Sequence, residues 1–457
     1  MTLIKSISGI RGTIGGAVED SFTPNDIVKF VAAFGYWLKK SDAHKKKIVI
    51  GRDARLSGEI VSKIVSATLQ SLGLDVVDLE LSTTPTVEMA VVAENALGGI
   101  ILTASHNPKE WNALKLLNYK GEFVNGNDVA EILDWADNGK YEYVGVDELG
   151  NYSVKNDYIN YHIDQIKALP LVNTEAIRER KFKVAVDAVN STGGIAVPML
   201  LKSLGVETIA LLNCTPDGKF AHNPEPLTEN LTELQGMMLE QKFDIGIAVD
   251  PDVDRLVLMC ENGTPFNEEY TLVAVADYIL SNTIGNTVSN LSSTKALKDV
   301  TQSKGGNYYA SAVGEVNVVE KMKEVNAVIG GEGNGGIIYP DLHYGRDALV
   351  GIALMLSSLA VNKTTLSALK SNYPQYYMYK HKIELSPKMT LTAILEKMKQ
   401  LYSQSTIITI DGIKIEMEED CWVHLRASNT EPILRIYSEA KTYEKAKAIA
   451  LQVCAQI

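Results

Sequence analysis

Apolar and polar positions alternate along the chain in two patterns, which predict strands and helices in turn. The apolar run at 48–50 predicts a strand. The apolar residues within 60–72 recur at helical spacing, and a further strand is expected at 74–81. The same order of strand, helix and strand returns at 184–212 and, more weakly, at 287–309. Units of this kind predict sheets of parallel strands with helices on both faces.

Turn-rich and acidic segments divide this pattern into four parts. Polar, turn-forming residues at 138–151 and 373–376 predict two breaks, and an acidic loop near residue 255 predicts a third. A chain of 457 residues is long enough for several domains. We therefore expect three related α/β domains with mixed or parallel sheets and a smaller C-terminal α+β domain, over residues 1–150, 151–256, 257–372 and 373–457.

The composition argues against several classes of protein. A net charge of −12 disfavours a nucleic-acid partner, because phosphate backbones require basic surfaces. No apolar run approaches the ~20 residues of a membrane helix, and residues 1–5 do not resemble a signal peptide. Four cysteines without a Cys-x-x-Cys pair argue against disulfides or a zinc site and fit a reducing cytoplasm. We expect a cytoplasmic protein whose substrate is small, and anionic if arginines gather locally.

The first segment with chemical potential is the polar turn at 103–108, which contains Ser105. No Gly-x-Ser-x-Gly elbow surrounds this serine, so an acyl-enzyme is disfavoured. Pro108 biases the preceding residue away from helical conformation, so the hydroxyl is expected to project from a constrained turn. His106 and Lys115 are the nearest groups that can move protons or offset phosphate charge. An ordinary polar turn that caps a helix is the alternative.

Three carboxylates at alternate positions, Asp250, Asp252 and Asp254, form the second segment. In an extended loop such residues lie on one side, about 6.5 Å apart, and can converge on one hard cation. An EF-hand is disfavoured because Arg255 stands where its glycine should be and both flanks predict strands. A solvated acidic turn is a further alternative. We favour a Mg²⁺ site to which a phosphate on Ser105 would add an oxygen ligand.

Two further segments predict ligand binding. Five glycines within 330–336 allow close approach of a ligand, and Glu332 and Asn334 offer acceptors and donors. A ligand-free hinge is the alternative, and the absent Gly-Lys-Ser/Thr disfavours nucleotide binding. Residues 426–432, together with Arg435, combine two arginines with hydroxyl and amide groups, a set that suits an oxyanion. For Arg435 a surface ion pair is the alternative.

These four segments together closely resemble the motifs of the phosphohexomutase family, one in each expected domain. Residues 8–12 also resemble the family's opening motif, and Arg52, Asp53 and Arg55 resemble a structural network beside its phosphoserine. The resemblance implies four domains grouped around a central cleft. It further implies the following roles: Ser105, His106, Lys115 and Arg11 in catalysis; Ser105, Asp250, Asp252 and Asp254 at the metal; Glu332, Asn334 and Arg255 at the sugar; Arg426, Ser428, Asn429, Thr430 and Arg435 at the substrate's non-reacting phosphate.

The chain departs from the family pattern at three positions. Ala113 stands where the family usually has glycine, Asn334 where a serine is expected, and Gly336 where a histidine is expected. The proton transfer of that histidine would therefore fall to His106, Lys115 or another group. We expect His343, Arg346 and Asp347 to support the sugar loop. The remaining histidines are expected to be ordinary surface or core residues: His44, His162, His222 and His381.

The resemblance implies a mutase in which phosphorylated Ser105 converts a hexose monophosphate into a bound 1,6-bisphosphate. That intermediate turns round and returns its other phosphate to the serine, with Mg²⁺ as cofactor and the bisphosphate as activator. Glucosamine phosphate is the first choice of substrate, because the loop around Glu332 and Asn334 resembles one branch of phosphoglucosamine mutases. Glucose or mannose phosphates are the alternative. A metal-dependent sugar phosphatase and a silent sugar-phosphate-binding protein are more remote, and the chain is expected to be a monomer or homodimer.

Overall fold

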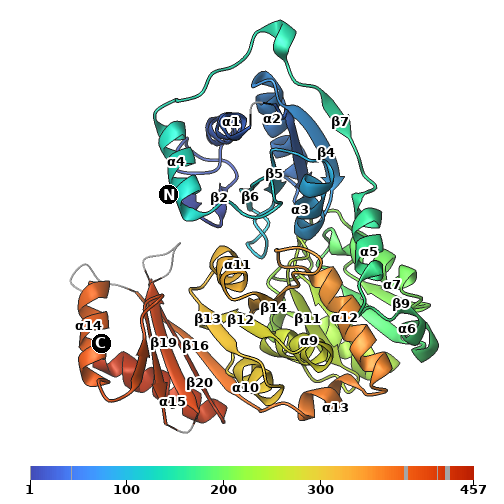
Figure 1. Cartoon of the computed structure of the whole chain (residues 1–457), viewed down its shortest axis with the longest axis vertical. Helices are drawn as coiled ribbons and strands as arrows, with labels where there is room; N and C mark the ends of the chain where they lie inside the picture. Colours follow the sequence, from blue (N-terminus) through green and yellow to red (C-terminus); the bar gives the residue numbers. More distant parts are fainter. Residues whose placement is uncertain (1, 43, 385–389, 419, 428–432) are drawn as a thin grey trace. The chain divides into compact units, whose positions relative to one another are not determined.

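The computed structural model describes residues 2–42, 44–384, 390–418, 420–427 and 433–457 (Figure 1). They group into two units. Unit 1 comprises residues 1–271 and 335–368, and unit 2 comprises residues 272–334 and 369–457.

The first sheet of unit 1 has the strand order β1-β2-β6-β5-β3-β4-β7. These strands are Ile4–Ser6 (β1), Gly9–Thr13 (β2), Lys47–Arg52 (β3), Asp75–Leu81 (β4), Gly98–Leu102 (β5), Trp111–Leu117 (β6) and Tyr152–Val154 (β7). β3 pairs in parallel with β4 and β5, as the strand–helix–strand pattern predicted, whereas β6 runs antiparallel to β5. β7 joins β4 in parallel, so this sheet continues past residue 150.

Helices cover both faces of this sheet, as expected. They are α1 (Pro24–Ser41), α2 (Gly58–Ser71), α3 (Thr84–Ala93) and α4 (Gly126–Asp137). Helix α1 begins at a capping box of Thr23 and Asp26. Alternate residues of β3 point to opposite faces: Ile48 and Ile50 pack with α1 and α2, and Val49 packs with α3.

The second sheet of unit 1 has the order β11-β10-β8-β9. Its strands are Lys183–Asp187 (β8), Thr208–Leu212 (β9), Ile245–Val249 (β10) and Leu256–Cys260 (β11), and β15 (Gly336–Ile338) also belongs to unit 1. β8 pairs in parallel with β9 and β10, and β11 runs antiparallel to β10. The helical segments are η1 (Val146–Glu148), α5 (Tyr158–Ala168), α6 (Thr174–Arg180), α7 (Gly193–Ser203), η2 (Thr228–Asn230), α8 (Thr232–Gln241) and α12 (Ala348–Val361).

Unit 2 contains a parallel sheet and an antiparallel sheet. The parallel strands are Asn286–Asn290 (β12), Tyr308–Ser311 (β13) and Ala327–Glu332 (β14), with helices α10 (Ala296–Ser303) and α11 (Glu315–Glu324), which confirms the weaker third repeat. The chain passes between the units within α9 (Glu268–Asn282) and α13 (Leu366–Ser371).

The antiparallel sheet of unit 2 has the order β16-β20-β19-β18-β17. Its elements are Tyr377–Glu384 (β16), Leu391–Leu401 (α14), Thr406–Ile408 (β17), Ile413–Met417 (β18), Cys421–Ala427 (β19), Ile433–Ala440 (β20) and Tyr443–Gln456 (α15). Apolar residues of α14 and α15 pack with inward residues of the strands. The four sheets thus confirm three α/β parts and a C-terminal α+β part.

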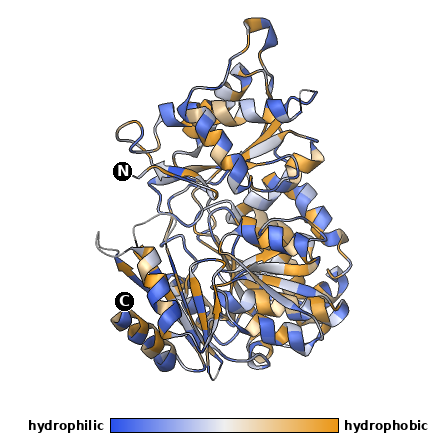
Figure 2. Ribbon diagram, turned by 60° about the vertical axis from the view of Figure 1, so that its left-hand side comes forward, coloured by the Kyte–Doolittle hydropathy of each residue, from blue (hydrophilic) through white to orange (hydrophobic). Residues whose placement is uncertain are grey.

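Apolar residues lie within the layers, and polar residues predominate on the outer faces of many helices (Figure 2). Helix α12 is the exception, because all of its residues except Val361 are buried. Among the described residues, no helix is both long and apolar enough to cross a membrane.

Candidate active site

The serine turn follows directly from β5, whose five residues are all buried. Ser105 is itself buried and adopts a φ of 47°, in the left-handed region that residues other than glycine seldom occupy. Its backbone N–H donates to Thr103 Oγ1 at 2.9 Å, and the N–H of Asn107 donates to the carbonyl of Ala104 at 3.0 Å. The constrained turn that the sequence predicted is therefore present.

Arg55 holds this turn from beneath. Its guanidinium donates to the carbonyl oxygens of Ser105, Asn107 (2.7 Å), Pro108 (2.7 Å) and Trp111 (3.0 Å). Its Nε donates to Asp53 Oδ2 at 2.9 Å, and the same oxygen accepts from the Thr103 hydroxyl at 2.7 Å. The expected structural network around Asp53 and Arg55 is thus confirmed.

The acidic loop is turned rather than extended, so the predicted extended geometry is wrong. Val253 has a φ of 63°, and its N–H donates to the carbonyl of Asp250 at 3.1 Å. Asp250 Oδ1 accepts from the backbone N–H groups of Asp254 and Arg255, both at 3.2 Å. One carboxylate oxygen from each of Asp250, Asp252 and Asp254 lies within 4.8 Å of the others, closer than an extended loop would allow.

The structure brings Ser105 to this acidic trio. Its hydroxyl donates to Asp250 Oδ2 at 2.7 Å, across 145 residues of sequence. Asp252 Oδ1 and Asp254 Oδ1 are buried and lack hydrogen-bond partners within the described ranges. Two oxygens without partners beside a third carboxylate and a serine are the hard donors that a divalent cation prefers. The residues present therefore fit a metal ion.

Cations surround the outer side of the trio. Lys115 Nζ lies 2.6 Å from Asp252 Oδ2 and 3.2 Å from Asp254 Oδ2, and Arg346 Nη2 lies 2.7 Å from Asp254 Oδ2. Burial raises the pKa of Asp254, but Arg346, Lys115 and Arg255 outweigh it and lower that pKa overall. Burial and the neighbouring carboxylates of Asp254 and Asp252 raise the pKa of Asp250 well above its usual range. A cation at the trio would therefore relieve repulsion that Lys115 and Arg346 leave uncompensated.

His106 lies on the other side of the serine. Its Nδ1 is 3.4 Å from Ser105 Oγ and accepts from Arg255 Nη2 at 2.8 Å. Burial, Arg255 and Arg11 lower the pKa of His106 well below its ordinary value, so the ring is neutral. Burial would also lower the pKa of Lys115, but Asp252 and Asp254 raise it overall, so Lys115 remains a cation.

Two arginines beside the serine carry donors without printed acceptors. Arg11 Nη1 donates to Asn107 Oδ1 at 3.4 Å, and Arg255 Nη1 pairs with Glu225 at 3.1 Å. The Nε groups of Arg11 and Arg255 are buried and lack hydrogen-bond partners in the part of the chain described. Arg255, expected at the sugar, thus lies beside Ser105, where its guanidinium can meet an anion.

In unit 2, Glu332 ends β14 and is buried. Its Oε1 accepts from Asn290 Nδ2 at 2.7 Å and from the N–H of Gly314 at 3.1 Å. The N–H of Gly333 donates to Ser293 Oγ at 2.9 Å, and Asn334 follows in the turn. The glycine-rich segment is therefore a hydrogen-bonded turn at a strand end.

The two predicted phosphate-binding arginines occupy facing positions of neighbouring strands. Arg426 on β19 pairs in register with Arg435 on β20, which in turn pairs with Lys382 on β16. Like charges at paired positions repel each other, so this row favours an anion. Asp411 Oδ2 lies 3.7 Å from Arg426 Nη1. The other predicted residues of this loop lie outside the described ranges: Ser428, Asn429 and Thr430.

Sequence reasoning missed or misassigned several neighbours of the trio. Arg346, expected to support the sugar loop, instead binds Asp254. The Thr84 hydroxyl donates to Asp252 Oδ2 at 2.6 Å, although no motif marked it. His162, expected to be unremarkable, is fully buried and bonded to Asp347. The contacts span between 92 and 185 residues, and no local pattern encodes them.

Three α/β parts and a C-terminal α+β part, together with a serine beside three buried carboxylates, define a phosphohexomutase. The chain belongs to the phosphoglucomutase/phosphomannomutase family. Its alpha/beta/alpha domains I, II and III match residues 3–142, 160–263 and 267–377, and its C-terminal domain matches residues 382–456. It is accordingly an isomerase that moves a phosphoryl group within its substrate.

Relatives cover nearly the whole chain. A phosphoglucomutase/phosphomannomutase of Thermococcus kodakarensis is 36% identical over 95% of each chain. A phosphoglucosamine/phosphogalactosamine mutase of Sulfurisphaera tokodaii is 32% identical over 94% of this chain and 95% of the relative. The crystal structure of a phosphoglucomutase/phosphomannomutase family protein from Burkholderia thailandensis superposes with a TM-score of 0.83 at 24% identity, over 99% of this chain and 98% of that one, which supports the fold.

Proposed function

We propose that this enzyme interconverts 6-phospho and 1-phospho hexoses through a phosphate carried on Ser105 and a bound hexose 1,6-bisphosphate. The observation that carries the proposal is the hydrogen bond from the Ser105 hydroxyl to Asp250, beside two carboxylates with unused oxygens. A serine in this setting suits a phosphoryl group that must be gained and lost repeatedly.

The residues of unit 1 would fix the serine and balance charge during transfer. Arg55 holds the carbonyl groups of the turn, so Ser105 Oγ keeps its position as the phosphorus–oxygen bond breaks. Lys115 remains protonated and anchors Asp252 and Asp254. Mg²⁺ held by Ser105 and the three aspartates would supply positive charge to the transferring group.

Proton transfer is assigned to His106. The sugar hydroxyl oxygen forms a bond to phosphorus as the bond to Ser105 Oγ breaks, and the hydroxyl proton must leave. The neutral ring of His106 lies within 3.4 Å of Ser105 Oγ and can take that proton, which it returns in the reverse transfer. Arg11 and Arg255, whose Nε groups lack acceptors among the described residues, would meet the phosphate oxygens.

Unit 2 would recognise the rest of the substrate. Glu332 and Asn334 are assigned to sugar hydroxyl or amine groups. The arginine row of β19 and β20, together with Ser428, Asn429 and Thr430, is assigned to the phosphate that does not react. One anion site that accepts either phosphate would let the bisphosphate bind in both orientations, as the reaction requires.

The first choice of substrate pair is glucosamine 6-phosphate and glucosamine 1-phosphate. The loop around Glu332 and Asn334 supports it, and so does the name of the Sulfurisphaera tokodaii relative. Glucose and mannose phosphates are the alternative, supported by the name of the Thermococcus kodakarensis relative. A metal-dependent phosphatase is a more remote alternative.

The test compares kcat/KM for glucosamine, glucose and mannose phosphates, with Mg²⁺ and a trace of the matching bisphosphate. We expect the wild type to prefer glucosamine phosphate. Ser105→Ala should lose nearly all turnover and still bind substrate, whereas Ser153→Ala, on β7, serves as the matched control. Undiminished mutase activity in Ser105→Ala would remove the phosphoserine mechanism. Steady release of inorganic phosphate without isomerisation would favour the phosphatase.

A further inference from the structure

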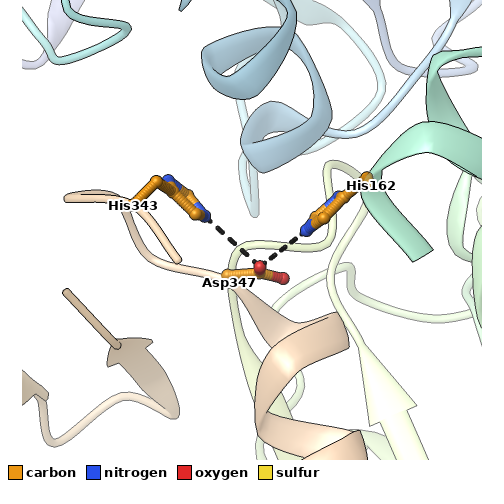
Figure 3. A group of neighbouring side chains, drawn as sticks. All are labelled: His162, His343 and Asp347. Carbon is orange, nitrogen blue, oxygen red and sulfur yellow. Dashed lines mark hydrogen bonds and ion pairs between the residues drawn. The ribbon is translucent and has the colours of Figure 1, made fainter. Parts of the chain in front are cut away.

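A second cluster of metal-ligating side chains lies within unit 1, separate from the acidic trio. His162 on α5, His343 in the segment before α12, and Asp347 at the N-cap of α12 point toward one another (Figure 3). One ligand atom of each lies within 4.8 Å of the others. None of these residues has a role in the mutase reaction proposed above.

The distances in this cluster suit a small metal ion. Asp347 Oδ2 lies 2.8 Å from His162 Nε2 and 3.3 Å from His343 Nε2. Around Zn²⁺, whose bonds to nitrogen and oxygen are about 2.0–2.1 Å long, ligands of a tetrahedron are separated by roughly 3.3 Å. A modest outward movement of the two rings would therefore place all three atoms at ligand distance from one ion.

The second nitrogen of each ring has the partner that a metal-bound imidazole requires. His162 Nδ1 lies 3.0 Å from Thr86 Oγ1, and His343 Nδ1 lies 3.2 Å from Glu88 Oε2. Metal-bound histidines usually donate their remaining N–H to a carboxylate, carbonyl or hydroxyl group, which fixes the ring's orientation. Both Nε2 atoms are thus directed to the same point by partners behind them.

Asp347 is also prepared to supply one oxygen. Its Oδ1 caps α12 by accepting from the N–H groups of Leu349 and Val350, so only Oδ2 faces the histidines. The site is strongly negative: burial alone would lower the pKa of His343, but Asp347 and Glu88 raise it to about 10. A divalent cation would meet the same favourable field.

An ion has a route to this point. A cavity of about 470 Å³ on unit 1 is lined by His343 together with Met89, Val92, Tyr161, Gln165 and Asp341. Two hydrophobic side chains and one polar amide on this wall leave room for a water molecule as a fourth ligand, as in zinc sites with three protein ligands.

We propose that His162, His343 and Asp347 form a transition-metal site, with Zn²⁺ as the preferred ion, oriented by Thr86 and Glu88 and distinct from the Mg²⁺ site. Two imidazoles and one carboxylate favour Zn²⁺ over Mg²⁺, which selects oxygen ligands. The site joins α5 to the start of α12, and α3 carries both Thr86 and Glu88. Its bound ion would therefore fix these three helices together.

The test is zinc binding to the full-length, metal-stripped protein. Asp252→Asn serves as the background, because it weakens the acidic trio. We expect this variant to bind one equivalent of Zn²⁺ by calorimetry. Adding His343→Gln should weaken that binding at least about 100-fold. Adding His222→Gln, which removes a histidine paired with buried Asp187 elsewhere in unit 1, should leave it unchanged.

X-ray absorption on the wild type loaded with one equivalent of Zn²⁺ in excess Mg²⁺ provides a second readout that needs no variant. We expect two imidazole ligands with oxygen and without sulfur. A shell of oxygen alone, or of cysteine sulfur, would overturn the proposal. So would equal zinc affinity with and without His343, which would leave the cluster as a hydrogen-bonded histidine pair.

Discussion

At the scale of single residues, Arg55 determines the shape of the serine turn. Its fully buried side chain donates to four backbone carbonyl oxygens and to Asp53. Only a planar guanidinium offers donors in enough directions for this, because an ammonium has three donors at a single point. The left-handed conformation of Ser105 is thus held by contacts made to its backbone.

We expect Arg55→Lys to lower kcat by about 100-fold with a smaller change in KM, because small misplacements of a reacting group cost that much. Steady-state kinetics with saturating Mg²⁺ measure this, with Arg52→Lys as the matched control. Arg52 is half-buried and donates to a single carbonyl, that of Asp53. A kcat unchanged in Arg55→Lys would show that the turn keeps its shape without the guanidinium.

Sequence reasoning identified the residues of this site better than their geometry. Ser105, Asp250, Asp252 and Asp254 were recognisable because their motifs are local. The turn at Val253 was not, since a β-branched residue disfavours positive φ and the alternation of acids predicted an extended loop. Arg346 reaches Asp254 only through tertiary packing.

At the scale of elements, the C-terminal end of α3 joins three other segments through Glu94. This buried carboxylate bonds to Lys47 on β3 at 2.6 Å, to Lys155 after β7, and to Tyr158 at the start of α5. Burial alone would raise the pKa of Glu94, but hydrogen bonds from Lys155, Lys47 and Tyr158 lower it to about 2. Glu94 therefore stabilises the folded state when it is ionised.

We expect Glu94→Gln to lower the free energy of unfolding at pH 7 by about 1–3 kcal/mol, allowing for the half-exposed lysines. The folded-state pKa lies below the ordinary value, so the stabilisation is complete above pH about 4.5 and disappears as the pH falls toward 2. Urea denaturation across this range should show the gap between wild type and variant closing. Exposed Glu179→Gln is the control. A gap independent of pH would contradict this account of Glu94.

Amphipathic elements were predictable from spacing, whereas buried helices were not. The helix at 60–72 and the strands around it have a polar side, so their periodicity is visible. Helix α12 is apolar on all sides, and only one of its 14 residues escapes burial. Such a segment has no moment that distinguishes it from buried strand. β7 was missed because its three residues are exposed.

At the scale of the whole molecule, the chain forms two units that do not follow its order. Residues 335–368 return to unit 1, because α12 packs with α5, α6 and α7. Contiguous boundaries drawn from turn-rich segments could not anticipate this return. Ser105, the acidic trio and Arg346 all belong to unit 1, whereas Glu332 and the arginine row belong to unit 2.

We expect thermal unfolding to depart from two-state behaviour, since each unit has its own hydrophobic clusters. Mg²⁺ should raise the transition temperature of unit 1, because it binds the folded trio only. Scanning calorimetry with and without Mg²⁺ measures both effects, and Asp252→Asn should abolish the shift. A single two-state transition that Mg²⁺ leaves in place would contradict this prediction.

The most direct test of the central claim is the identity of the phosphorylated residue. The enzyme is incubated with hexose 1,6-bisphosphate and Mg²⁺, digested, and its peptides are analysed by mass spectrometry. We predict one phosphate, on Ser105, that is lost when hexose monophosphate is added and absent from Ser105→Ala. Turnover without any phosphate on Ser105, or phosphate on another residue that supports turnover, would contradict the account.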